Sequence, residues 1–299
     1  SRFGVISMKI LMILAMMGWG LVWPLSKIMS ETLNPEQASC IRFIIVSLSF
    51  LPIMYIYKIP FKIPKIALIP VLLTGIFNTA YSYLMYMGLL YGDAGSAGVI
   101  AEVLPIIIAA FLYSFMKQTT LLKREKWALF FGILAGVFLI NLFENWRAIF
   151  MPFNVIFLLA ALAWAMLIIS SRYATEYVSA ISLSFYSSLC TALFLLPSFL
   201  YYGLAPLGEV GMNFWILALI AALFCTTFST TIYYRGLYVL GVTQGGIYAL
   251  LTPPSALLFA WLILDEMPQT HTIIGGIISI FTIYLMNYYN PKHFRIFKS

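Results

Sequence analysis

Ten long apolar stretches, separated by short polar connections, run along nearly the whole chain. Within each stretch the apolar residues are continuous and do not alternate with polar ones, which indicates helices and excludes the alternating pattern of a membrane β-barrel. Each stretch has the ~20 residues that a helix needs to cross ~30 Å of hydrocarbon. The sequence therefore predicts an all-α integral membrane protein with transmembrane helices at 8–29, 36–57, 65–90, 94–116, 121–142, 151–173, 177–201, 211–235, 241–264 and 270–290.

The composition agrees with this prediction. Apolar residues make up 63% of the chain and charged residues 9%, whereas a soluble domain has about 25% charged residues. The first apolar stretch is too long for a signal peptide and no small-residue cleavage pattern follows it, so we expect it to be retained. The three cysteines lie in predicted helices and are odd in number, which favours apolar packing over disulfides (Cys40, Cys190 and Cys225).

The basic residues predict the orientation, because Lys and Arg accumulate in cytoplasmic loops. With the N-terminus inside, fourteen of them fall on the cytoplasmic side, and only Lys27, Arg42 and Arg147 fall outside. We therefore expect both termini to be cytoplasmic, in a bacterial inner membrane, with residues 291–299 as a basic tail. The net charge of +7 suits an anionic inner leaflet and gives no reason to expect nucleic acid as a partner.

The two halves of the chain, 8–142 and 151–290, are related by an internal repeat. At an offset of 148 residues, 88–105 aligns without a gap with 236–253, and a Pro ends both segments. Because each half has five predicted helices, an odd number, the second repeat is expected to be inverted relative to the first. The same offset aligns two polar pairs, Asn78 and Ser82 with Thr226 and Thr230.

Several short motifs occur together with this repeat. They are Trp19-Gly20 followed by Pro24, Pro35 ahead of Ala38 and Arg42-Phe43, mid-helix prolines in the fourth and ninth helices, and Asp265-Glu266 before Gly275-Gly276. With five-plus-five inverted helices, this sequence resembles the drug/metabolite transporter superfamily, and within it the ten-helix EamA-type bacterial exporters. The first half departs from that pattern at Lys117-Gln118, where a longer basic loop precedes the fifth helix. The resemblance implies exchange of a small solute by alternating access.

Glu102 is the acid that lies deep inside an apolar stretch. It is eight residues into the fourth helix, or ~12 Å from its outer end, which places it near the middle of the bilayer. A buried acid in a membrane is costly unless it is solvated, paired or protonated. Glu102 is therefore expected to bind an amino or other cationic group, or to carry a proton. The alternative is a protonated side chain that hydrogen-bonds to a neighbouring helix.

Other candidates for substrate binding share mid-helix positions. The aromatic ones suit a cationic group through cation–π attraction, although plain packing is the alternative for each, and the polar ones either line a cavity or bond to backbone carbonyls one turn back. Gly95 and Gly98 share a narrow face with Glu102, which favours close helix packing. Lys27 and Arg42 either attract carboxylates or snorkel to the outer surface. The candidate binding residues are Glu102, Trp19, Asn78, Tyr81, Ser82, Trp164, Thr230 and Tyr248.

The sequence predicts a secondary transporter of amino acids or related amphiphilic or cationic metabolites, with export as the expected direction. The first, third, fourth, sixth, eighth and ninth helices are expected to line its cavity, with the fifth and tenth peripheral. Prolines that interrupt helical hydrogen bonding are expected to act as hinges, at Pro24, Pro105, Pro253 and Pro254. The expected partners are a small-molecule substrate, the lipid bilayer and, as a further candidate, protons; both a monomer and a homodimer remain open.

Two other classes of function are alternatives to transport of solutes. A lipid-carrier flippase would need a groove that opens sideways into the bilayer. An enzyme is disfavoured, because the two histidines, His271 and His293, have no metal-ligand spacing and no catalytic motif is present. No catalytic residue, metal or cofactor is therefore predicted.

Overall fold

The computed structural model describes residues 2–118, 120–240 and 247–288, and every element within these residues is helical. The prediction of an all-α protein is thus confirmed for this part of the chain. The first half contains α1 (Arg2–Thr32), α2 (Pro35–Ile56), the short 3₁₀ turn η1 (Lys65–Ala67), α3 (Leu68–Gly88), α4 (Ala94–Lys117) and α5 (Lys123–Ile140).

The second half begins with the 3₁₀ turn η2 (Trp146–Phe150), α6 (Pro152–Ala174), α7 (Ala180–Tyr202) and η3 (Ala205–Gly208). One continuous helical segment follows, made of α8 (Gly211–Leu219), the π-helical η4 (Ile220–Phe228) and α9 (Ser229–Leu240). The last elements are η5 (Tyr248–Leu251), α11 (Thr252–Leu264) and α12 (Thr270–Tyr288). Residues 241–246 of the predicted ninth helix, the last two residues of the tenth and the tail 291–299 lie outside the described residues.

Seven helices in the described part of the chain are long and apolar enough to cross a bilayer, judged by length and composition. They are α1, α2, α3 with η1, α4, α6, α7 and the α8–η4–α9 segment. Two shorter apolar helices follow at Tyr248–Leu264 and Thr270–Leu285. The first turn of α5 carries four charged residues in a row, from Lys123 to Lys126. Ten membrane crossings, and the two five-helix units of residues 8–142 and 151–290, therefore stay predictions.

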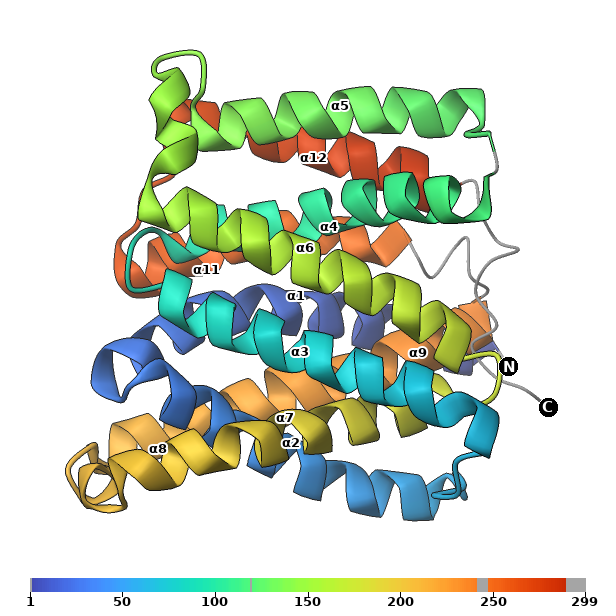
Figure 1. The fold of residues 1–299 in the computed structure, drawn as a ribbon, viewed down its shortest axis with the longest axis vertical. Coiled ribbons are helices and arrows are strands. Elements are labelled where there is room, and N and C mark those ends of the chain that lie inside the picture. The colour runs from blue at the N-terminus through green and yellow to red at the C-terminus, as the bar shows by residue number, and fades with distance from the viewer. Residues whose placement is uncertain (1, 119, 241–246, 289–299) are drawn as a thin grey trace.

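The helices lie side by side, with α5 and α12 paired at one edge and α2, α7 and α8 at the opposite edge (Figure 1). In the middle, α6 packs against α3 and α4, while α1 packs against α11 and the α8–η4–α9 segment. In the predicted repeat α6 corresponds to α1, and α3 and α4 correspond to α8–η4–α9 and α11. Each of these contacts between the two halves thus has a counterpart, as a repeat requires, while inversion of the second half stays a prediction.

Small residues allow α1 and α4 to approach α11 closely. A Cβ atom at Gly20 would lie 2.7 Å from the backbone nitrogen of Ala256, and one at Gly98 would lie 2.7 Å from the Ala256 Cβ. Both distances are too short for a side chain, so glycine is required at each position for this packing. The glycine face of α4 is therefore a packing face, and Glu102 follows Gly98 by one helical turn.

The predicted orientation can be tested with cysteine probes on a cysteine-free background. The connection between α7 and α8 and the start of α5 lie at opposite ends of the helix bundle (Figure 1). We expect a membrane-impermeant thiol reagent applied to intact cells to label a probe at Glu209 and to spare one at Lys123. The reverse labelling pattern would overturn the predicted orientation, and labelling of both would indicate mixed insertion.

Candidate functional site

A central cavity of about 1130 Å³ runs between the helices. Exposed residues line it at one end, namely Lys117, Thr120, Lys123 and Arg124, so it opens at the end of the bundle where α5 begins. The charge bias predicts this end to be cytoplasmic. Besides α1, α3, α4, α6 and the η4–α9 segment, α2 and α7 also line the cavity. The predicted set of lining helices lacked these two, while α5 and α12 contribute only residues near the end of the bundle where the cavity opens.

Glu102 lies on the cavity wall and is partly exposed to the cavity. Among the described residues, no hydrogen bond or ion pair to its carboxylate is present in the structure. Its electrostatic neighbours are the side chains of Tyr81 on α3 and Tyr233 on α9. The structure therefore presents Glu102 as a carboxylate that faces the cavity, and not as one that is bonded to a neighbouring helix.

Two aromatic pairs stand in the same wall. Trp19 on α1 packs against Tyr233 with ring centroids 4.8 Å apart, and Trp164 on α6 packs against Tyr81 at 4.5 Å. All four side chains line the cavity. The two pairs correspond to each other in the predicted repeat, because α1 corresponds to α6 and α9 lies in the segment that corresponds to α3. Glu102 is thus flanked by two Trp–Tyr pairs, and each pair joins a residue of the first half to a residue of the second.

The polar candidates Asn78, Ser82 and Thr230 also line the cavity. Asn78 is at the same time tied to α7, because its amide nitrogen donates to the Thr191 hydroxyl at 2.8 Å. Of the eight predicted binding residues, the structure brings seven together in this one cavity. Tyr248 is the exception: it lies in η5, where its neighbour Ala249 lines the cavity instead.

The four prolines occupy two kinds of position. Pro24 lies inside α1 and Pro105 inside α4, where each removes an internal hydrogen bond. Pro253 and Pro254 lie in the first turn of α11, directly after η5, where a missing backbone N–H costs the helix nothing. The described part of the predicted ninth helix thus includes a 3₁₀ turn, whereas its counterpart α4 is α-helical from Ala94 to Lys117. The hinge role of the four prolines stays a prediction.

Arg42 on α2 lines the cavity although only 8% of the residue is exposed. Its Nε and Nη2 atoms donate to the Thr226 hydroxyl at 3.1 and 2.9 Å. Thr226 lies in the π-helical η4 and donates its own proton to the carbonyl of Ala221, five residues earlier, at 2.7 Å. Irregular turns of this kind are frequent at functional sites. This one fixes the hydroxyl that holds Arg42.

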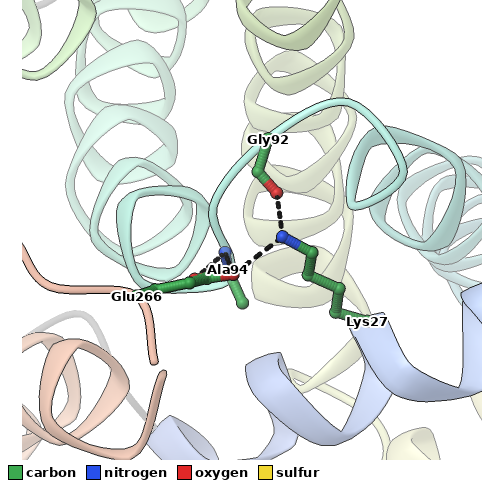
Figure 2. Close-up of polar contacts among 4 residues, drawn as sticks. All are labelled: Lys27, Gly92, Ala94 and Glu266. Carbon is green, nitrogen blue, oxygen red and sulfur yellow. Dashed lines mark hydrogen bonds and ion pairs between the residues drawn. The ribbon is translucent and has the colours of Figure 1, made fainter. Parts of the chain in front are cut away.

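Lys27 pairs with an acid at the far end of the bundle from the cavity mouth. Its ammonium group donates to Glu266 Oε1 at 2.7 Å and to the Gly92 carbonyl at 2.9 Å, and Glu266 Oε2 accepts from the Ala94 N–H at 2.8 Å (Figure 2). These contacts join α1, the start of α4 and the connection between α11 and α12. The sequence left two alternatives for Lys27, attraction of a carboxylate or snorkelling to the outer surface. In the structure Lys27 binds a carboxylate of the protein itself, that of Glu266.

Two residues that the structure places at the site were absent from the predicted set, Tyr233 and Arg42. Tyr233 follows Thr230 by three residues and Thr226 by seven, so its helical spacing puts it on the same face as these two polar residues. The helical spacing in the sequence was therefore sufficient to predict Tyr233 as a residue of the site. From its position near the predicted outer end of α2, Arg42 could either snorkel to the surface or face the cavity. Only the packing of α2 against η4 decides between these two orientations.

Comparison with known proteins agrees with this architecture. The EamA-like transporter family matches residues 6–142 and, a second time, residues 151–288, which shows that the domain is duplicated. Two uncharacterized transporters of Bacillus subtilis (strain 168) are similar: YetK is 25% identical over 256 residues, covering 80% of this chain and 74% of YetK, and YdfC is 25% identical over 271 residues, covering 88% and 85%.

A crystal structure of a protein has the same fold, with a TM-score of 0.62 and 14% identity over 94% of this chain and 96% of that one. The two matched ranges account for nearly the whole chain. Together with the apolar helices, they show that this multi-pass membrane protein is a transporter and belongs to the EamA-like transporter family.

Proposed function

We propose that the protein is a secondary transporter that exports amino acids or related small amphiphilic or cationic metabolites by alternating access. The observation that carries this proposal is Glu102, a carboxylate that faces the cavity at a mid-helix position and has no hydrogen bond or ion pair among the described residues. An ammonium group in the cavity would neutralise the charge of Glu102. Its hydrogen bond to the carboxylate would compensate for the water molecules that the ammonium group loses when it enters the cavity.

The aromatic pairs around Glu102 suit the same kind of ligand. A cation over the face of a Trp or Tyr ring gains about 0.5–2 kcal/mol, most where water is excluded. The rings of Trp19 and Trp164 also offer apolar surface to the uncharged part of an amphiphilic molecule. A carboxylate between aromatic walls therefore selects a compound with an amino group and an apolar body.

The shape of the cavity supports alternating access with loading from the cytoplasm. The cavity opens at the predicted cytoplasmic end, and the Lys27–Glu266 contacts join three segments at the other end. A carrier must also adopt the opposite arrangement, with the site open to the outside. Because Glu102 is an acid in the cavity wall at a mid-helix position, the proton is the candidate coupling ion. The proposal fits a monomer as well as a homodimer.

A ligand screen on the purified protein tests this proposal. A compound that binds the folded state raises its apparent stability, by about 2.7 kcal/mol at a concentration of 100 times Kd. We expect stabilisation by amino acids or amphiphilic amines from a panel that also contains polyamines and simple carboxylates, and we expect the binders to be taken up by proteoliposomes. Scrambling of labelled lipids without uptake of any of these solutes would instead support a flippase and contradict the proposal.

A further inference from the structure

Arg42 carries a buried positive charge whose partners within the described residues are all neutral. Besides the Thr226 hydroxyl, its guanidinium contacts the Met85 sulfur at 4.0 Å and lies 4.9 Å from the centre of the Phe43 ring. The ion pair found among the described residues joins Lys27 to Glu266, not Arg42 to an acid. A buried charge without a counter-ion is costly, so a group that supplies a negative charge from the cavity would be bound strongly.

The guanidinium group of Arg42 is also oriented to bind a negatively charged group. Arginine has five N–H donors, and two hydrogen bonds hold Nε and Nη2 to the single hydroxyl of Thr226. The hydroxyl cannot turn away, because its own proton is committed to the Ala221 carbonyl. The remaining N–H groups of Nη1 and Nη2 meet no other oxygen in the described residues. A planar fork of this kind matches the two oxygens of a carboxylate.

Arg42 and Glu102 face one cavity but do not neutralise each other. Both line the cavity wall, and Tyr81 interacts electrostatically with each of them. Their charged atoms are nevertheless too far apart to form an ion pair, since Lys27–Glu266 is the pair present in the described residues. A molecule that carries both a negative and a positive group would compensate both charges at once.

The mouth of the cavity favours the same ligand. Its lining includes Lys117, Lys123, Arg124 and Arg172, against the single acid Glu125. Such a positive rim attracts molecules that carry a carboxylate and repels simple cations. A purely cationic substrate would meet this rim before it reached Glu102, whereas a zwitterion would not be repelled as a whole.

We propose that Arg42 is the carboxylate-binding residue of the site, so that the substrate is a zwitterionic amino acid whose ammonium group faces Glu102. This inference rests on the proposed function and narrows it. Among the classes of substrate named above, it selects amino acids over amines and polyamines.

Binding to the purified protein by isothermal titration calorimetry tests the assignment, with two matched pairs as probes. These are L-leucine with 3-methylbutylamine, and L-phenylalanine with 2-phenylethylamine; each amine is the amino acid without its carboxylate. We expect the wild type to bind the amino acids at least tenfold more tightly than the amines, as a hydrogen bond between charged groups provides. Arg42→Gln should remove this preference, so that each amino acid binds no more tightly than its matched amine.

Thr226→Val provides a second variant, because it leaves the arginine in place and removes the hydroxyl that orients it. We expect an intermediate loss of the preference for amino acids, which keeps the assignment testable if Arg42→Gln does not fold. Equal binding of amines and amino acids by the wild type would overturn the role of Arg42 but leave the amine site at Glu102 intact. Failure of all four compounds to bind would overturn the proposed function with it.

Discussion

Glu102→Gln is expected to reduce transport of amino-group substrates by tenfold or more in proteoliposomes. The substitution keeps the shape of the side chain and its ability to accept a hydrogen bond, but removes the negative charge. A hydrogen bond between charged groups contributes about 1.5–3 kcal/mol to stability or binding, and 1.4 kcal/mol corresponds to a tenfold change in affinity. Initial rates of uptake, measured across a range of pH for both proteins, provide the readout.

A matched control is Glu209→Gln, which makes the same chemical change at an exposed residue outside the cavity. We expect this variant to transport at the wild-type rate. The Glu102 variant should elute from a size-exclusion column as the wild type does, since its carboxylate holds no neighbouring helix in the described structure. An unchanged rate and an unchanged pH profile for Glu102→Gln would leave Glu102 with a structural role.

Lys27→Met should destabilise the protein by about 3 kcal/mol, because breaking one partner of a buried ion pair costs roughly 3–5 kcal/mol. The side chains of Lys27 and Glu266 are only 17% and 10% exposed, so solvent compensates little for the loss. The estimate lies at the lower end because the carboxylate keeps its bond to the Ala94 N–H. Thermal denaturation in detergent should show a lower melting temperature than for Lys126→Met, a change of an exposed lysine.

Exchanging the two charges, as Lys27→Glu with Glu266→Lys, should not restore the stability. Each partner also binds a backbone group of fixed polarity: Lys27 donates to the Gly92 carbonyl, and Glu266 accepts from the Ala94 N–H (Figure 2). In the exchanged variant a carboxylate would face the carbonyl and an ammonium group the N–H. Recovery of wild-type stability in the double variant would show that charge attraction alone accounts for the contact.

The elements and the overall class could be predicted from the sequence because they depend on local patterns. The length and continuity of the apolar stretches fixed where helices form, and boundary residues such as Asn34, which accepts from the Gln37 N–H at 3.0 Å, lie where the polar connections begin. The repeat likewise left a trace in residue spacing, and the family match shows the same duplication. Local patterns could not show that η4 is π-helical or that the 3₁₀ turn η5 directly precedes α11.

The candidate site was predictable where chemistry made a residue unusual in its surroundings. Glu102 stood out because an acid in an apolar stretch is costly, and Trp19 and Trp164 because they recur near the start of each half. Tyr248 shows the limit of this reasoning, since an aromatic residue in the interior of a helix faces a cavity or a neighbour with equal ease. The sequence does not show whether the Tyr248 side chain faces the cavity or packs against a neighbouring helix.

The sequence by itself determined that the chain forms apolar helices in two related halves, with an acid at mid-helix, because helix formation and burial in lipid depend on residue type and local spacing. The tertiary structure alone decided which side chains share the cavity. Lys27 and Arg42 are two basic residues near predicted outer helix ends, yet one meets Glu266, 239 positions away, and the other meets a hydroxyl and the cavity. The reason is that a buried charge takes whatever partner the packing of distant helices brings to it, and that packing is set by close contacts such as those at Gly20 and Gly98.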